Sequence, residues 1–264
     1  MIRTLLFASL LAATAGSSVA AEHVRPLDPH ALTVVLVHGA FADGSSWGQV
    51  IPRLASWGVP AVAVQNPLTS LEDDVAATRR AIRAAPGKVV LVGHSWGGTV
   101  ITEAGNDPKV SALVYVAAFA PDAGENSAQQ GQGYPVAPGL SRLLEREGFL
   151  SLPEAAVRED FAPDLKPATA RLIYRTQGPL KASALAEPVT QAAWRGKPSW
   201  YVLSRHDRML SPQLQAATAR RIGAQVHSLS ASHVSLLSQP GAVTDAILEA
   251  AGIQAAATAA DSGG

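Results

Sequence analysis

The sequence predicts an α/β protein with a mostly parallel central sheet, helices on both faces of that sheet, and a helical cap inserted after the fourth strand. Three observations predict this fold. Apolar runs of strand length alternate with helical patterns, these runs are continuous in Val and Leu, and one long stretch interrupts the alternation. Continuous apolar runs are typical of strands buried on both faces, as in parallel sheets covered by helices.

The expected strands lie at residues 33–37, 61–64, 88–92, 112–116, 200–203 and 225–229. Between them, Ser70 opens a helix through an N-cap box, and Val75 and Ile82 share one face of that helix. The last helix has Pro240 near its start and Gly252 as its stop. This alternation places the α/β core at residues 21–120 and 198–253.

Residues 121–197 form the interruption. They contain no good strand but three helical pieces that begin with proline, at 153–157, 167–174 and 188–194. An insertion of this length is too large for a simple loop, so we expect a helical cap. Its aromatic residues would line an apolar pocket or, more commonly, pack the cap onto the core. They are Tyr134, Phe149, Phe161, Tyr174 and Trp194.

Both ends of the chain have compositions of their own. A basic start at Arg3, an apolar run at residues 5–13 and the small residues Ser18 and Ala20 predict a signal peptide over residues 1–20. The apolar run is too short to span a membrane, so we expect a bacterial periplasmic or secreted protein without stable membrane association. Residues 254–264 are of low complexity and are expected to form a disordered tail.

The composition excludes several function classes. The formal net charge is zero and 16% of residues are charged, without a run of Lys or Arg, so we expect no nucleic-acid partner. The chain has no Cys, which excludes disulfides, thiol nucleophiles and zinc–thiolate sites. No metal-ligand spacing is visible either, so we expect no metal and no cofactor. These features leave the oligomeric state open.

The segment Gly93-His94-Ser95-Trp96-Gly97 carries the chemistry. It has the pattern G-x-S-x-G between an expected strand and an expected helix, which is the setting of a nucleophile elbow. In such a tight turn the central Ser is exposed above the sheet. Its glycine neighbours allow the chain to pass close to the following helix, because Gly has no Cβ. The pattern predicts Ser95 as a nucleophile.

A serine nucleophile needs a base, and the base needs an acid that orients it. Elbow proteins place these in the chain order Ser, Asp or Glu, His. Of the seven His residues, His233 alone lies in the loop between the last expected strand and the last helix. Asp207 directly follows the strand at 200–203 and would emerge at the carboxyl edge of the sheet. Asp122, after the preceding strand, is the alternative acid, and a surface ion pair with Arg205 or Arg208 is the alternative role of Asp207.

Acyl transfer also requires hydrogen-bond donors for the developing oxyanion. The first strand is followed by His38-Gly39-Ala40-Phe41, where Gly39 allows the backbone to turn an N–H inward. We expect the backbone N–H groups of Ala40 and Trp96 to form this oxyanion hole. Phe41 is the alternative to Ala40.

Together these residues resemble the alpha/beta-hydrolase superfamily in order and spacing. The resemblance is strongest to the single-domain branch of esterases and hydroxynitrile lyases that includes the plant methyl-salicylate esterases. Members of this branch have a Val-His-Gly-Ala start and a downstream Trp, which are similar to residues 37–40 and to Trp47. The resemblance implies a serine hydrolase that cleaves a small uncharged carboxylic ester through an acyl-enzyme, without a cofactor.

Two features favour ester hydrolysis within this superfamily. The hydroxynitrile lyases of the branch carry Thr in the oxyanion turn and Lys after the catalytic His, whereas this chain has Gly39 and Val234. Dehalogenases and epoxide hydrolases use an Asp nucleophile, where this chain has Ser95. A lyase, lactonase or amidase on the same fold remains an alternative, because a fold does not determine its chemistry. A non-catalytic binding protein is a further alternative, although such proteins usually lack a member of the triad.

Overall fold

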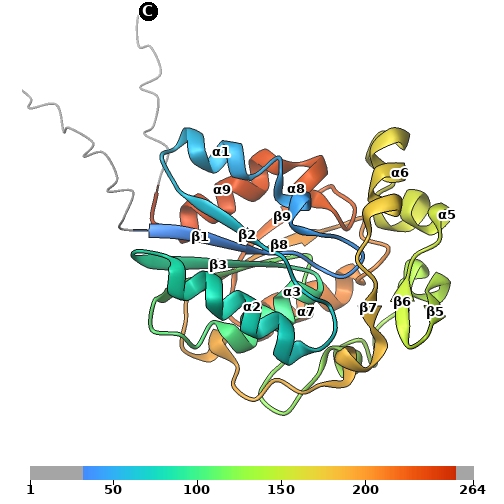
Figure 1. Ribbon diagram of the computed structural model, residues 1–264, viewed down its shortest axis with the longest axis horizontal. Coiled ribbons are helices and arrows are strands. Elements are labelled where there is room, and N and C mark those ends of the chain that lie inside the picture. The colour runs from blue at the N-terminus through green and yellow to red at the C-terminus, as the bar shows by residue number, and fades with distance from the viewer. Residues whose placement is uncertain (1–31, 254–264) are drawn as a thin grey trace, which may run out of the picture.

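The central sheet has six parallel strands in the order β2-β1-β3-β4-β8-β9 (Figure 1). The computed structural model describes residues 32–253, so the expected leader at 1–20 and the tail at 254–264 lie outside the described residues. The strands are β1 (Leu32–Val37), β2 (Ala61–Val64), β3 (Lys88–His94), β4 (Val110–Val116), β8 (Ser199–Ser204) and β9 (Gln225–Leu229). All six predicted strands are confirmed, with β3 running on to His94 and β4 beginning at Val110.

The middle strands of the sheet carry the core. In β1, β3, β4 and β8 nearly every residue is buried, and the register aligns Leu36, Val92, Val114 and Trp200 across these four strands. The edge strands β2 and β9 are partly exposed. Burial on both faces was therefore a correct expectation for the middle of the sheet only, because the helix layers do not cover its edges fully.

Helices cover both faces of the sheet (Figure 1). One face carries α1 (Ile51–Ser56), α8 (Ser235–Ser238) and α9 (Pro240–Ala250), and the other carries α2 (Leu71–Ala84), α3 (Trp96–Ala104) and α7 (Pro212–Arg221). The Ser70 hydroxyl caps α2 by accepting from the Asp73 N–H at 3.0 Å, but the Asp73 carboxylate binds Thr69 instead of closing a box. The last helix begins at Pro240 and is followed by Gly252 with φ +71°, as predicted.

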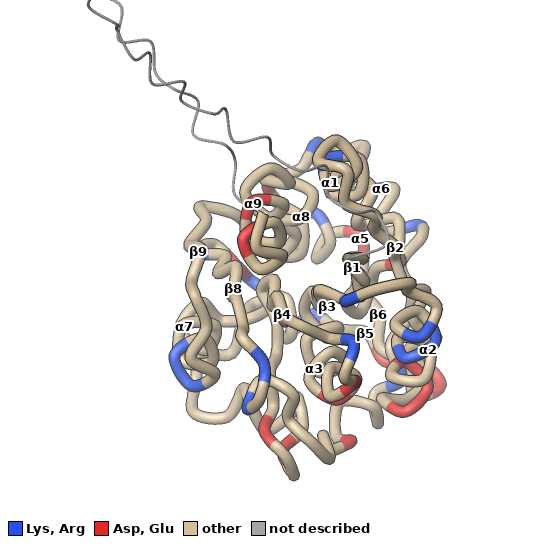
Figure 2. The backbone as a smooth tube through the Cα atoms, turned by 90° about the vertical axis from the view of Figure 1, so that its left-hand side faces the viewer, with Lys and Arg blue, Asp and Glu red and all other residues tan. Residues whose placement is uncertain are grey.

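Charged residues lie mainly on the outer helices and loops, whereas the middle strands of the sheet contain few of them (Figure 2). Within residues 32–253, no helix is both long enough and apolar enough to cross a bilayer.

The segment between β4 and β8 packs at the carboxyl ends of the strands (Figure 1). Its helices are α4 (Ser127–Gln130), α5 (Glu154–Ala156) and α6 (Pro167–Thr176), and a π-helical turn, η3 (Val157–Phe161), directly follows α5. Short 3₁₀ turns lie at Gly44–Trp47 in the core and at Pro138–Arg142, Ala182–Ala186 and Ala193–Arg195 in the cap.

The prediction of a cap without strands is wrong. A three-stranded antiparallel sheet joins β5 (Leu144–Arg146), β6 (Phe149–Ser151) and β7 (Leu180–Lys181). The two residues between β5 and β6, Glu147 and Gly148, both have positive φ, which is the geometry of a tight hairpin. The helix expected at 188–194 is also absent, since only the short turn Ala193–Arg195 forms at its end.

Candidate active site

The predicted elbow forms between β3 and α3. Ser95 has φ +52° and ψ −120°, a conformation that is costly for any residue except Gly. Strand β4 and the residues after it support this turn, because the Ser95 N–H donates to the Val116 carbonyl at 3.1 Å and the Ser95 carbonyl accepts from the Phe119 N–H at 3.3 Å. Strain of this kind is typical of a functional position, where the surrounding structure holds it in place.

The glycines of the elbow are required by close packing. A Cβ on Gly93 would lie 2.4 Å from the Gly97 carbonyl oxygen, and a Cβ on Gly97 would lie 2.5 Å from the Val37 carbonyl oxygen. Both distances are too short for any side chain. The expectation that the chain passes close to the following helix is therefore confirmed at Gly93.

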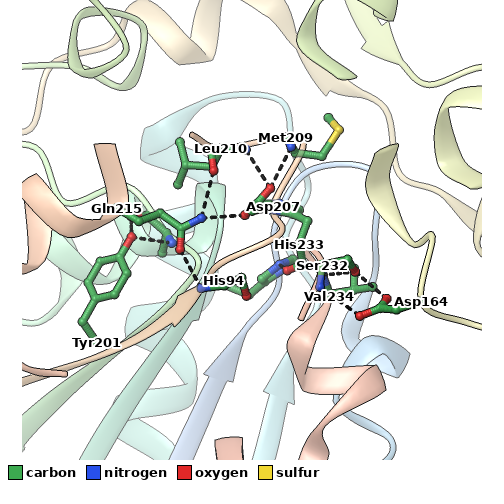
Figure 3. Close-up of polar contacts among 12 residues, drawn as sticks. His94, Asp164, Tyr201, Asp207, Met209, Leu210, Gln215, Ser232, His233 and Val234 are labelled. Atoms are coloured by element: carbon green, nitrogen blue, oxygen red, sulfur yellow. Dashed lines mark hydrogen bonds and ion pairs between the residues drawn. The ribbon is translucent and has the colours of Figure 1, made fainter. Parts of the chain in front are cut away.

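His233 and Asp207 form a buried hydrogen-bonded pair (Figure 3). The distance from His233 Nδ1 to Asp207 Oδ2 is 2.7 Å, and the two side chains are 2% and 0% exposed. A carboxylate can only accept, so Nδ1 donates in this bond, and in the neutral imidazole Nε2 then keeps a free lone pair. This is the tautomer that a general base needs in order to take a proton from a hydroxyl group.

Four donors surround the Asp207 carboxylate. Oδ1 accepts from the backbone N–H groups of Met209 at 2.7 Å and Leu210 at 2.8 Å. Oδ2 accepts from the Gln215 side-chain amide at 2.8 Å, in addition to His233 (Figure 3). These bonds fix the plane of the carboxylate and therefore the direction in which it meets the imidazole.

The alternative acid, Asp122, lies in a different ion pair. Both of its oxygens bind the Arg195 guanidinium, and those hydrogen bonds lower the pKa of Asp122 from its ordinary value. The structure thus places Asp207 against His233 and Asp122 against Arg195. The surface ion pair considered for Asp207 does not form either, because Arg208 pairs with Asp160.

His94, the residue before Ser95, contacts both the backbone and the ring of His233. Its Nε2 donates to the His233 carbonyl oxygen at 3.0 Å, and the centroids of the two rings are 4.7 Å apart. Burial holds the pKa of His94 well below its usual range, and the neighbouring His233 lowers it further. His94 is therefore a neutral support, without a charge that would oppose protonation of His233.

The candidate oxyanion donors are the backbone N–H groups of Ala40 and Trp96. Ala40, Ser95 and Trp96 line one cavity, and Trp96 is the first residue of α3, whose N–H has no acceptor within its own helix. The alternative donor, the Phe41 N–H, instead donates to the Gly178 carbonyl of the cap at 3.0 Å. The geometry therefore favours Ala40 over Phe41.

His38 holds the turn after β1, which carries the candidate donor Ala40, in place. Its Nδ1 donates to the Gly39 carbonyl at 2.8 Å, and its Nε2 accepts from the Asn66 N–H at 3.0 Å. The Asn66 side chain in turn donates to the His38 carbonyl at 3.0 Å. Burial lowers the pKa of His38, so the ring stays neutral and keeps one donor and one acceptor.

The side chain of Trp96 is held by a buried carboxyl group. Its Nε1 donates to Asp74 Oδ2 at 2.7 Å, and the other oxygen of Asp74 accepts from the Leu68 N–H at 2.7 Å. Burial raises the pKa of Asp74 to about 6, although both hydrogen bonds act in the opposite direction. Asp74 thus connects the first turn of α2 to the first residue of α3.

A cavity of about 440 Å³ lies between the cap and the core, and Ser95 and His233 both line it. Its walls are mostly apolar, and within the described residues they include no Lys, Arg, Asp or Glu. The apolar lining includes Phe41, Phe119, Tyr134, Val136, Leu140, Leu143, Leu150, Leu180, Leu185, Met209 and Leu214. Of the five cap aromatics noted in the sequence, only Tyr134 is among these lining residues.

A model of the Alpha/beta hydrolase family matches residues 34–246. This range includes Ser95, Asp207, His233 and the whole central sheet except its first two residues. The last turn of helix α9 lies beyond it. The chain belongs to the alpha/beta hydrolase family. The resemblance inferred from the motifs is confirmed at this level.

The similarity between this alpha/beta hydrolase and its named relatives covers nearly the full length of each relative. "Probable hydrolase R7" from a Phoma species is 29% identical over 249 residues, which cover 83% of this chain and 98% of the relative. Among solved structures, a pyrethroid hydrolase from Sphingobium faniae JZ-2 has a TM-score of 0.72 at 22% identity, covering 83% of this chain and 96% of its own. The Arabidopsis methylesterase MES16 has a TM-score of 0.69 at 20% identity, covering 84% and 99%. The structural likenesses show the fold.

Several supporting residues of this hydrolase were not identified from the sequence. Gln215 is fully buried, and it also accepts from the Ser204 N–H at 3.0 Å, so it joins the end of β8 to Asp207. The contact of Asp74 with Trp96 and that of His94 with His233 were also not predicted from the sequence. Asp74 and His94 lie 22 and 139 residues from Trp96 and His233, and Gln215 lies eight residues from Asp207, so none of these contacts belongs to one local motif. The one local signal was the position of His94 inside the elbow.

Proposed function

We propose that this alpha/beta hydrolase is a serine esterase that cleaves uncharged carboxylic esters with apolar acyl or alcohol groups. The observation that carries the proposal is a cavity that Ser95 and His233 both line, with His233 hydrogen-bonded to Asp207. The apolar walls support a substrate without charge, because desolvating an ion in such a cavity is costly. The names of the methylesterase and pyrethroid hydrolase structures agree with ester or related hydrolysis.

The mechanism follows from the roles of these groups. His233 Nε2 takes the proton of the Ser95 hydroxyl while Oγ attacks the ester carbonyl carbon. The N–H groups of Ala40 and Trp96 stabilise the resulting oxyanion. His233 then returns the proton to the departing alcohol, which leaves an acyl group on Ser95. Water, activated by the same His233, hydrolyses this acyl-enzyme and releases the acid.

The test is a substrate panel of neutral esters, amides, lactones and cyanohydrins, with Ser95→Ala and His233→Ala measured beside the wild-type protein. We expect ester turnover in the wild type and a loss of roughly 10³-fold or more in each variant, with the fold retained by circular dichroism. Cyanohydrin cleavage without ester turnover would assign a lyase instead. Retained ester turnover in Ser95→Ala would refute the mechanism.

We also propose that the protein acts in the periplasm or outside the cell. The support is the leader pattern at residues 1–20, which lies outside the described residues. Cell fractionation and N-terminal sequencing of the exported protein test this, and the expected mature start is Ala21. Recovery of the chain in the cytoplasm with Arg3 still present would contradict it.

A further inference from the structure

One short segment of the cap contacts both loops that carry the catalytic acid and base. The segment consists of the π-helical turn η3 and the residues that follow it, up to Asp164. π-helical turns are rare in proteins overall, but those that occur are often found at functional sites. The proposed function uses Asp207 and His233 but assigns no task to this segment.

Asp160 holds the acid loop. Its side chain is 0% exposed, and its Oδ1 accepts from Arg208 Nε at 2.8 Å. Arg208 directly follows Asp207, and its carbonyl accepts from the N–H of the cap residue Gly139 at 2.9 Å. The acid loop is therefore bound to the cap through both the side chain and the backbone of Arg208.

Asp164 holds the base loop in a similar way. Its two oxygens accept from the Ser232 N–H at 2.9 Å and from the Ser232 hydroxyl at 2.5 Å (Figure 3). Ser232 directly precedes His233. The two aspartates lie four residues apart in the cap, and each binds a residue next to one member of the acid–base pair.

Between these two contacts, Phe161 packs on the base itself. Its ring centroid lies 5.3 Å from that of His233 and 6.5 Å from that of Phe41. The two core loops also contact each other, since the His206 N–H donates to the Ala231 carbonyl at 3.0 Å. The cap segment therefore closes a ring of contacts around the His233–Asp207 pair.

We propose that Asp160 and Asp164 are positioning residues that clamp the acid and base loops, so that the cap sets the geometry of the His233–Asp207 pair as well as covering the cavity. This inference rests on the proposed serine-esterase function. Positioning of this kind affects the rate strongly, because a displacement of about 1 Å in a catalytic group can cost roughly 100-fold. Neither aspartate lines the cavity, so neither is expected to affect substrate binding directly.

The chain provides a matched control for Asp160. Arg142 binds the other oxygen of the same carboxylate at 2.9 Å, but Arg142 belongs to the cap and contacts neither catalytic loop through this bond. Arg208→Gln removes the side-chain contact between cap and acid loop and leaves the backbone bond from Gly139, whereas Arg142→Gln removes contacts within the cap, to Asp160 and Glu159. The side chains of Arg208 and Arg142 are 49% and 33% exposed, respectively, so both variants are expected to fold.

The experiment measures kcat and KM with a neutral aryl ester at a temperature well below the thermal midpoint of unfolding. That midpoint is measured separately for each variant. We expect Asp160→Asn, Arg208→Gln and Asp164→Asn each to lower kcat by roughly 10- to 100-fold with KM within about twofold. Arg142→Gln should keep kcat within about twofold of the wild-type value, although its thermal midpoint falls by about as much as that of Arg208→Gln. The double variant Asp160→Asn/Arg208→Gln should lose no more activity than the stronger single variant, because both substitutions break one contact.

Equal effects of Arg142→Gln and Arg208→Gln on kcat, or losses of kcat that follow the thermal midpoint, would overturn the clamp. Ser95→Ala is measured in parallel. If that variant is inactive while the clamp variants keep kcat, the proposed function stands and the clamp fails. If Ser95→Ala is active, the proposed function itself fails.

Discussion

Asp207 is the residue whose surroundings define its role most sharply. Its carboxylate accepts from Met209, Leu210, Gln215 and His233, so each bond restricts the position from which it meets the imidazole. Asp122, by contrast, is bound by Arg195 on the outside of the molecule. Two carboxylates that the sequence offers for one task therefore have separate environments.

Replacing each of these aspartates by Asn distinguishes them. Asp207→Asn should lower kcat by about 10⁴-fold, because an amide donates toward His233 and favours the wrong tautomer. Asp122→Asn should change kcat by less than about twofold, since it alters a largely exposed ion pair. Steady-state ester hydrolysis measures both, and the reverse ranking would make Asp122 the acid.

Gln215 offers a second test at the same scale. Gln215→Leu removes the side-chain donor to Asp207, and we expect kcat to fall by roughly 10-fold or more as the carboxylate loses its orientation. Gln213→Leu is the matched control, because Gln213 is exposed on the same helix and, among residues 32–253, its side chain is hydrogen-bonded to the nearby Ser211 and not to Asp207. Similar kcat values for the two variants would show that Gln215 has a structural role alone.

The sequence predicts the candidate catalytic residues better than the residues that support them. Ser95, Asp207 and His233 follow from a motif and from chain order, because acyl transfer requires these residue types in loops at one edge of the sheet. Gln215 and Asp74 have no such signal. Gln215 acts through Asp207, eight residues away, and Asp74 through Trp96, 22 residues away, and neither spacing belongs to a known motif. A buried Gln or Asp is recognisable only when that partner is known.

At the scale of elements, Asp74 links α2 to the start of α3 and should affect stability with pH. Its pKa is about 6 in the folded chain and close to the ordinary 3.8 when unfolded. The folded protein therefore binds the proton more tightly, and its contribution to stability is lost as the pH rises from about 4 through 6. The shift corresponds to roughly 3 kcal/mol.

Urea unfolding of the wild type and of Asp74→Asn at several pH values measures this contribution. The unfolding free energy of the wild type, relative to that of the variant, should fall by up to roughly 3 kcal/mol between pH 4 and pH 7. The comparison removes the contributions of the other titrating groups. Parallel curves for the two proteins would contradict the assignment.

The elements of the core were predictable and those of the cap were not. Strands such as β3 are continuous apolar runs because both faces are buried, which gives a strong local signal. In the cap, β5 has three exposed residues and pairs through a turn at Glu147 and Gly148 that lacks the usual Asn-Gly or Asp-Gly pattern. Pairing across so few residues is set by tertiary contacts, so the sequence pattern does not reveal it.

At the scale of the whole molecule, the cap and core together form a cavity whose described lining carries no charged Lys, Arg, Asp or Glu side chain. We therefore expect discrimination by charge. An aryl hexanoate should have a kcat/KM at least about 100-fold higher than the matched ester with a carboxylate at the end of its acyl chain, because the cavity offers that charge no partner. Equal values would place a cationic subsite at the cavity.

The most direct test of the central claim is covalent labelling of the nucleophile. A phosphonofluoridate reacts with an activated serine when Oγ attacks phosphorus and fluoride leaves, so the adduct reports the hydroxyl that His233 and Asp207 activate. Intact mass and peptide mapping should give one adduct per chain, on Ser95, with ester hydrolysis lost in proportion to labelling. Labelling at another residue, or full activity with Ser95 modified, would contradict the account.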